Sequence, residues 1–292
     1  MRVRKAVFPA AGWGTRFLPA TKAQPKEMLP LVDKPIIQYG VEEAVAAGIE
    51  QIIIVTSTHK GAIEDHFDLN YELEHLLEEK GEIEKLRQVR AISDLAQLAY
   101  VRQKEQLGLG HAVLMAKDLI GHEPFAVILP DDVCIGERPV IGQLIHAYHQ
   151  THGSVVAVME VPPEETSRYG VIASEPTEDP LDHGRLHRVT RLVEKPAPKD
   201  APSNLGIIGR YVLTPKIFDK LEQTQRGAGG EIQLTDAIQA LMEEQQVFAY
   251  AFEGVRYDAG TTLGWLKASV ELALQRPELG PEFREYLAGL QL

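Results

Sequence analysis

The segment Phe8-Pro9-Ala10-Ala11-Gly12-Trp13-Gly14-Thr15-Arg16-Phe17, with Lys26 ten residues after Arg16, is the stretch that decides the fold. The apolar run over residues 5–9 is typical of a buried strand that ends in a glycine-rich turn. Glycines let backbone N–H groups converge on an anion, and a concave row of such donors suits phosphate. Arg16 adds a bidentate fork and Lys26 a point charge. The segment predicts a nucleoside triphosphate site, although glycines after a strand also serve as a plain flexible turn.

Two common phosphate-binding motifs do not fit this spacing. The dinucleotide fingerprint requires a third glycine three residues after the second, where a helix opens. The P-loop requires a glycine, four residues, and then glycine, lysine and a hydroxyl residue. Counted from Gly12, both motifs need a glycine where Phe17 stands. The spacing therefore disfavours an NAD-dependent oxidoreductase and a P-loop enzyme.

The composition excludes several classes of partner. The 292 residues carry 30 basic and 42 acidic side chains and a formal net charge of −12, which argues against general nucleic-acid binding. The single cysteine, Cys134, rules out an intrachain disulfide and fits a reducing compartment. No apolar run reaches the ~20 residues that span a bilayer, and the N-terminal apolar run breaks at Pro9, too early for a signal peptide. We expect a cytoplasmic protein that binds neither nucleic acid nor membrane.

Short β-rich apolar runs alternate with helix-like segments, which is typical of a parallel sheet with helices on its faces. Strands are expected at residues 5–9, 51–56, 99–102 and 124–129, with helices at 36–47, from about 61, and at 110–120. Beyond residue 154, strands are expected at 155–161, 170–173, 186–193, 204–213 and 247–252, with helices at 216–223, 234–244 and 263–275. The sequence predicts an α/β fold with a mixed, mainly parallel sheet flanked by helices.

The domain organisation follows from this pattern. We expect one domain over residues 1–275, followed by a C-terminal helical tail over 263–292. The first half, 1–153, carries the glycine-rich segment and a helical insertion over 60–95, and the second half, 154–262, supplies the acceptor site. The insertion is dense in Glu and Lys with leucines at helical spacing, so it is interpreted as a solvated helical hairpin, with a partner surface as the alternative.

Two acids follow the buried run that ends at Leu129. In open α/β sheets ligands bind at the carboxyl ends of the strands, and Mg²⁺ takes one or two protein carboxylates together with phosphate oxygens. We interpret Asp131 as a metal ligand and Asp132 as a structural partner, the alternative being a loop Asp that caps the next element. Asp258, in a turn before the last long helix, is a weaker indication, but carboxylates from distant segments can share one cation.

The second half offers polar groups suited to a sugar phosphate. Glu194 can accept hydrogen bonds from two neighbouring sugar hydroxyls, and Lys195 can neutralise a phosphate. Taken alone, this pair is also an ordinary surface ion pair. Gly170, and Asn204 with Gly206, lie on expected strands that bracket the pair, where they are otherwise ordinary turn or strand-edge residues.

Gln103 and Gly108 suit a nucleobase. A carboxamide carries both a donor and an acceptor, which matches the N3–H and O4 edge of uracil, and a glycine lets the backbone approach the base. Without the phosphate-binding segment, the same residues are a loop and a helix start.

Taken together, these motifs resemble those of the sugar-1-phosphate nucleotidylyltransferase family. The shared segments are Ala10–Arg16, Pro25-Lys26-Glu27-Met28-Leu29-Pro30 and Leu129-Pro130-Asp131-Asp132. A narrower resemblance, to bacterial-type UTP–glucose-1-phosphate uridylyltransferases, rests on 17–23, Arg168-Tyr169-Gly170-Val171-Ile172, 229–238 and Tyr257-Asp258-Ala259-Gly260. Trp13 departs from the family's small or aliphatic residue, and Gly206 from its frequent alanine.

The resemblance implies a Rossmann-like, glycosyltransferase-A-like fold with a smaller sugar-binding subregion, and it assigns roles to individual residues. Nucleotide binding is implied for Ala10, Ala11, Gly12, Gly14, Thr15, Gln103 and Gly108. Catalytic contacts with phosphates are implied for Arg16, Lys26 and Lys195, a magnesium site for Asp131 and Asp258, and glucose contacts for Gly170, Glu194, Asn204 and Gly206.

The implied reaction joins UTP and α-D-glucose 1-phosphate and yields UDP-glucose and pyrophosphate, with Mg²⁺ as cofactor. Two alternatives stay open: a thymidylyltransferase for glucose 1-phosphate, and a non-catalytic paralogue that senses nucleotide sugars. The charged helical insertion suggests a homodimer or homotetramer.

Overall fold

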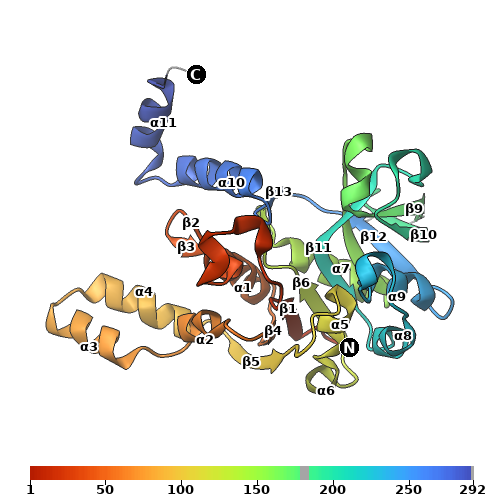
Figure 1. Ribbon diagram of the computed structural model, residues 1–292, viewed down its shortest axis with the longest axis horizontal. Coiled ribbons are helices and arrows are strands. Elements are labelled where there is room, and N and C mark those ends of the chain that lie inside the picture. Colours follow the sequence, from red (N-terminus) through yellow and green to blue (C-terminus); the bar gives the residue numbers. More distant parts are fainter. Residues whose placement is uncertain (178–183, 291–292) are drawn as a thin grey trace.

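A nine-stranded sheet forms the centre of the computed structural model, which describes residues 1–177 and 184–290 (Figure 1). The strands lie in the order β5-β4-β1-β6-β11-β8-β12-β10-β9. Their bounds are β1 Lys5–Pro9, β4 Gln51–Thr56, β5 Gln97–Arg102, β6 Phe125–Ile128, β8 Ser154–Glu160, β9 Gly170–Pro176, β10 Leu186–Glu194, β11 Leu205–Leu213 and β12 Val247–Ala251.

The sheet is mixed, as expected, but its parallel part is confined to one half. Strands β5, β4, β1 and β6 are all parallel neighbours. From β6 onward the pairings with β11, β8, β10 and β9 are antiparallel, with β8–β12 the parallel exception among them. The prediction of a mainly parallel sheet therefore holds for the first half only, because an apolar run shows burial on both faces but not the direction of its neighbour.

Helices cover both faces of the sheet, and alternation along β1 shows why. Ala6 and Phe8 pack with α1 (Ile36–Ala46), α2 (Gly61–Phe67) and α7 (Val140–Thr151) in one core. Val7 packs on the opposite face with α5 (Leu109–Leu114), α8 (Ile217–Gln223) and α9 (Leu234–Leu241). Because successive side chains of a strand point to opposite faces, an apolar strand supplies both cores.

Several elements differ from the expected ones. The helix expected at 110–120 is divided into α5 and α6 (Lys117–Ile120). Two short strands that were not expected, β7 (Asp132–Ile135) and β13 (Val255–Asp258), pair with each other and carry candidate site carboxylates at their ends. The hairpin of β2 (Pro30–Leu31) and β3 (Lys34–Pro35) follows Lys26 in the sequence. Cys134 on β7 is buried in the core.

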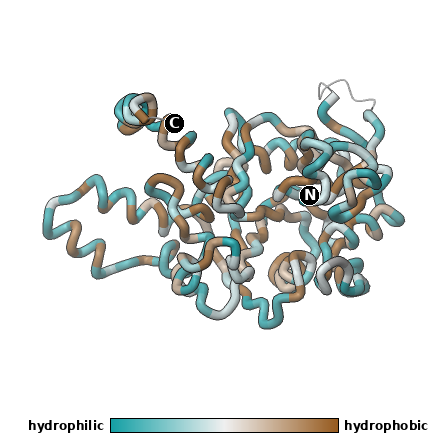
Figure 2. The backbone as a smooth tube through the Cα atoms, turned by 45° about the horizontal axis from the view of Figure 1, so that its top comes forward, coloured by the Kyte–Doolittle hydropathy of each residue, from teal (hydrophilic) through white to brown (hydrophobic). Residues whose placement is uncertain are grey.

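Two helical arms project from the sheet (Figure 1). One is the pair α3 (Tyr71–Glu79) and α4 (Ile83–Ser93), which lies where a helical hairpin was expected. The other is α10 (Thr262–Gln275) followed by α11 (Gly280–Ala288). Along both arms hydrophobic and hydrophilic residues alternate (Figure 2). Within the described residues, no helix combines the length and the apolar character needed to cross a membrane.

Candidate active site

Two cavities adjoin at the carboxyl ends of the parallel strands. The first, of about 570 Å³, is lined by the glycine-rich segment and by Lys26, Gln103 and Gly108. The second, of about 690 Å³, is lined mainly by residues of the second half, Glu194 and Lys195 among them. Arg16, Leu109, Leu129, Asp131 and Glu231 line both cavities. The site therefore has room for two ligands that meet beside one arginine and one aspartate.

The glycine-rich segment presents unpaired backbone donors to the first cavity. Within the described part of the chain, the N–H groups of residues 11–14 form no hydrogen bond. Gly14 has φ +67°, the left-handed region that glycine adopts without strain. The Ala11 carbonyl accepts hydrogen bonds from the Gln106 amide at 2.8 Å and from the Ser57 hydroxyl at 2.9 Å. Such a row of free N–H groups is what an anion requires.

Not every residue of this segment faces the cavity. Ala10 is fully buried, and its N–H donates to the Val55 carbonyl at 2.8 Å, so it continues the strand pairing. Trp13, in contrast, lines the first cavity and is 70% exposed. The structure thus places Ala11, Gly12, Gly14 and Thr15 at the cavity but not Ala10.

The two cations of the motifs, Arg16 and Lys26, contact residues far from them in the sequence. Lys26 Nζ lies 2.5 Å from Asp131 Oδ2, and Arg16 donates to the Gly260 carbonyl at 3.4 Å. Burial alone would lower the pKa of Lys26, but Asp131 and Glu27 outweigh it and raise that pKa. Burial would likewise raise the pKa of Asp131, and the Lys26 ammonium overcomes it and lowers that pKa. Both partners are therefore charged at neutral pH.

Asp131 and Asp258 come together on either side of Gly260. A Cβ atom added to Gly260 would lie 2.7 Å from Asp131 Oδ2 and 3.2 Å from Asp258 Oδ1. The Gly260 N–H also donates to Asp258 Oδ1 at 3.1 Å. The described residues contain no group of three or more His, Cys, Asp or Glu side chains that fits a metal. Two hard carboxylates near one another fit Mg²⁺, which completes its shell with water and phosphate oxygens.

A buried charge cluster holds the turn that carries Asp131. The Arg210 side chain is fully buried, and its Nη2 lies 2.7 Å from Glu43 Oε2 and 2.7 Å from the Asp132 carbonyl. Its Nη1 donates to the Leu129 carbonyl at 3.2 Å. The guanidinium therefore bonds both ends of the turn over residues 129–132, while Glu43 neutralises it from α1.

Asp132 is a structural partner, as interpreted from the sequence. Its Oδ2 accepts from the Gly209 N–H at 2.7 Å, and its Oδ1 accepts from Arg256 Nε at 2.8 Å. Arg256 in turn donates to the Tyr169 hydroxyl at 3.0 Å. Burial raises the pKa of Asp132 and Asp131 adds to this, while Arg256 and Arg210 oppose both. Asp132 thus joins the turn that carries Asp131 to β13 and to the wall of the second cavity.

The residues predicted to contact the sugar phosphate divide into two groups, according to whether they line the second cavity. Glu194, Lys195 and Gly170 line the second cavity, with Lys195 Nζ 3.3 Å from Glu194 Oε1. Asn204 and Gly206 line neither cavity. Asn204 is exposed, and a Cβ at Gly206 would lie 3.1 Å from a Val161 methyl group. The part of β11 that faces the cavity is its continuation from Ile207 to Tyr211.

The loop that carries Gln103 and Gly108 is fixed to the second half. Gln103 Nε2 donates to the Gly108 carbonyl at 3.2 Å and lies 2.9 Å from His111 Nδ1. Gly108 has φ +99°, and a Cβ there would lie 2.6 Å from the Glu231 Cβ. The Ile232 N–H donates to the Leu107 carbonyl at 2.7 Å. The two loops therefore form one wall shared by both cavities.

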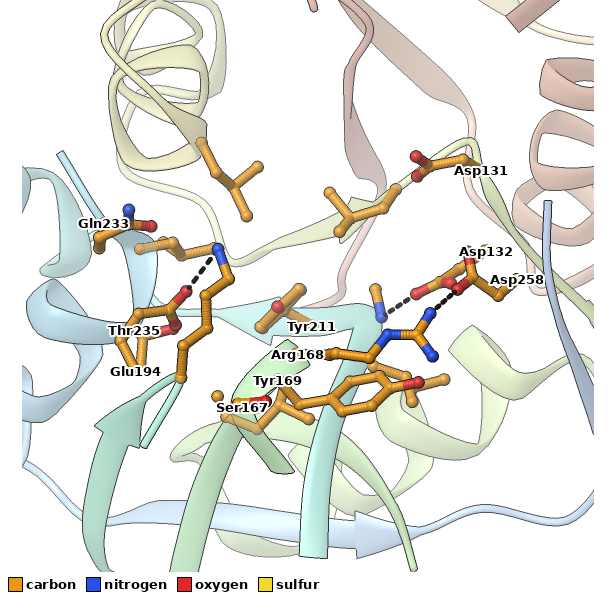
Figure 3. Close-up of a pocket in the computed structure, with 18 of the residues that line it drawn as sticks. Asp131, Asp132, Ser167, Arg168, Tyr169, Glu194, Tyr211, Gln233, Thr235 and Asp258 are labelled. Carbon is orange, nitrogen blue, oxygen red and sulfur yellow. Dashed lines mark hydrogen bonds and ion pairs between the residues drawn. The ribbon is translucent and has the colours of Figure 1, made fainter. Parts of the chain in front are cut away.

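Sequence reasoning missed several residues that line the second cavity. Figure 3 shows Arg168 extended toward Asp258, with Ser167, Tyr169, Tyr211, Gln233 and Thr235 around the same space. Arg168 and Tyr169 belong to one of the motifs that carried the narrower resemblance, and Glu231 and Thr235 belong to another. These two motifs were the only signal for these residues in the sequence analysis, because residue spacing alone assigned none of them a role.

Comparisons with known proteins agree with this geometry. A family model described as "Nucleotidyl transferase" matches residues 5–275. A Bacillus subtilis protein named UTP–glucose-1-phosphate uridylyltransferase is 58% identical over 290 residues, which is 99% of this chain and 97% of that protein. A Staphylococcus epidermidis protein of the same name is 56% identical over 292 residues, covering 100% of this chain and 99% of its own length.

Solved structures are also similar. A UDP-glucose pyrophosphorylase in complex with UDP-glucose has a TM-score of 0.85 and 47% identity, over 94% of this chain and 100% of that chain. A UTP-bound UGPase from Acinetobacter baumannii has a TM-score of 0.90 and 43% identity, over 99% of this chain and 100% of that chain. A Bacillus anthracis protein described as a putative glucose-1-phosphate thymidylyltransferase, at 22% identity and a TM-score of 0.70, shows the fold alone.

The buried Arg210–Glu43 pair generates a stability prediction. Arg210→Met leaves the Glu43 carboxylate buried without a counter-ion, and breaking such a pair costs about 3–5 kcal/mol. Urea unfolding should show this loss, and Glu43→Leu combined with Arg210→Met should unfold at a higher urea concentration than Arg210→Met alone. A loss below about 1 kcal/mol for the single variant would contradict the role given to the pair.

Proposed function

The chain belongs to the nucleotidyl transferase family, and from that membership we propose that it transfers the uridylyl group of UTP to α-D-glucose 1-phosphate, giving UDP-glucose and pyrophosphate. The observation that carries this proposal is the junction of the two cavities, where Arg16 and Asp131 line both. The 58% identity to a uridylyltransferase over nearly the whole chain supports this choice of reaction within the family.

The reaction is direct attack of a sugar-phosphate oxygen on the α-phosphorus of UTP, in line with the departing pyrophosphate. This nucleophile is already an anion and needs no activating base of the kind that a neutral hydroxyl requires. The main obstacle is the mutual repulsion of two polyanions. Arg16 and Lys26 at the first cavity and Lys195 at the second offset it, and they stabilise the charge that develops on the transferring phosphoryl group.

Asp131 and Asp258 would hold Mg²⁺, since their oxygens converge on the space beside Gly260. When bound, the ion polarises phosphoryl oxygens and offsets their charge. Lys26 pairs with Asp131 in the structure, and in the proposed reaction this lysine would turn from the carboxylate to the triphosphate.

Recognition of the two substrates divides between the halves of the chain. The Gln103 amide nitrogen is engaged, but its oxygen has no partner among the described residues and suits the N3–H of uracil. The free N–H groups of residues 11–14 suit the phosphates. Glu194 and Gly170 would contact glucose, and Asn204 and Gly206 are left out because they line neither cavity. We accordingly propose a nucleotide-binding half over 1–153, a sugar-phosphate half over 154–262 and a tail over 263–292.

A second copy of this chain is the proposed partner of the two arms. Exposed apolar side chains gather on both: Leu69, Tyr71, Leu73, Leu76 and Ile83 on the first arm, and Leu263, Leu266, Leu279, Tyr286 and Leu290 on the second. Exposed apolar patches mark interaction sites, which favours a homodimer or homotetramer. The lone cysteine favours a cytoplasmic location.

A pyrophosphate-release screen tests the proposed function. We expect release with UTP, glucose 1-phosphate and Mg²⁺ together, and none when any of the three is omitted. Replacing UTP by dTTP, or glucose 1-phosphate by galactose 1-phosphate, tests the related transferases, since dTTP differs from UTP only by the 2′-OH and the methyl group. Absence of release with every pair would instead favour the non-catalytic sensor.

Lys26→Ala tests the triphosphate contact. We expect turnover to fall by about 10²–10³, the loss typical of one donor to a developing charge, with little change in the melting temperature. Lys267→Ala is the matched control, because Lys267 is exposed and lines neither cavity. Near wild-type turnover of Lys26→Ala with UTP would remove Lys26 from the site.

A further inference from the structure

Four of the carboxylates that line the second cavity lie beside cations of the protein. Lys26 pairs with Asp131 at 2.5 Å, and Arg168 Nη2 with Asp258 Oδ2 at 2.9 Å. Asp132 is paired with Arg256, and Glu194 lies near Lys195. Since Asp131 and Asp258 are the candidate metal ligands, each of them has a protein cation in the place of a metal. Among these cations, the proposed function gives no role to Arg168 or to Arg256.

The position of Arg168 allows it to change partner. It ends the short helix Pro163–Arg168 and lines the second cavity, reaching across it to Asp258 (Figure 3). Its side chain is 45% exposed, whereas the side chain of Arg256 is 10% exposed and bonded to buried Asp132. Arg256 is therefore fixed, and Arg168 is a guanidinium held mainly by two partly exposed carboxylates, Asp258 and Glu165.

The groups that line the second cavity indicate which ligand Arg168 could bind. A divalent cation held by Asp258 would compete with the guanidinium, because both bind the same carboxylate. The released guanidinium then faces the cavity that would take the sugar phosphate, and a planar fork of donors suits a phosphate group. Lys195 lines the same cavity and pairs with Glu194, which Figure 3 shows on the side away from Asp258.

We propose that Arg168 binds the phosphate of the acceptor sugar phosphate, and that without substrates it occupies Asp258 in place of the divalent cation. The proposal rests on the proposed function for the identity of the acceptor. Metal and acceptor then favour each other's binding, because either one parts the same ion pair and such coupling is reciprocal.

Two measurements on Arg168→Gln test this proposal. In the substrate-free enzyme, calorimetric titration with Mn²⁺ should show affinity raised about two- to fivefold, because a half-exposed ion pair that competes for Asp258 is lost. In steady-state kinetics, KM for glucose 1-phosphate should rise about tenfold, which is the effect expected for the loss of one charge-assisted contact. KM for UTP should stay within about twofold of the wild-type value. Arg168→Lys should keep the Mn²⁺ affinity near wild type and recover part of the loss in KM.

Arg188→Gln is the matched control. Arg188 pairs with Glu175, its side chain is 48% exposed, and it lines neither cavity. Unchanged Mn²⁺ affinity in Arg168→Gln, an equal change in Arg188→Gln, or an unchanged KM for glucose 1-phosphate would each overturn the proposal. Failure of the wild type to form UDP-glucose would contradict the proposed function instead, and the Mn²⁺ titration would still report on the Arg168–Asp258 pair.

Discussion

The buried guanidinium of Arg210 is the constraint on which the rest of the site depends. It bonds the carbonyls of Leu129 and Asp132, the two ends of the turn that carries Asp131, and its charge is balanced by Glu43 from a helix far away in sequence. A buried ion pair of this kind adds little net stability relative to apolar residues. Its contribution here is geometric, because it sets the carboxylate of Asp131 at the wall common to both cavities.

Charge neutralisation explains how an acidic protein can bind two polyanions. The chain carries a formal net charge of −12, yet Arg16, Lys26, Arg168 and Lys195 face the two cavities. Protein carboxylates pair with three of these cations, so the side chains at the site carry no large unbalanced charge. In the proposed reaction, the substrates and a divalent ion would replace these protein partners. Once the partners have been exchanged, cations held in place around the transferring phosphoryl group would stabilise it without further rearrangement of solvent.

The sequence predicted much of the fold and the cavity-lining motifs, and its errors have physical causes. Strands with strong apolar patterns were placed within three residues of their ends, whereas the short partly polar strands β7 and β13 left no periodic signal. The Arg168–Asp258 pair spans 90 residues and forms only because the end of the short helix Pro163–Arg168 lies close to the end of β13 in space. The family resemblance assigned a glucose contact to Gly206, but the part of β11 that lines the second cavity begins one residue later, at Ile207. Motifs therefore indicated the chemistry, while the assignment of single contacts required the tertiary structure.

The central claim is that the adjoining cavities let the acceptor phosphate attack the α-phosphorus of UTP directly, with no covalent link to the protein. The most direct test is the stereochemical course with UTP made chiral at the α-phosphorus by sulfur substitution, followed by phosphorus NMR of the product. A single in-line displacement predicts inversion at that phosphorus. Retention would require two displacements through a nucleotidylated side chain, and it would contradict the account.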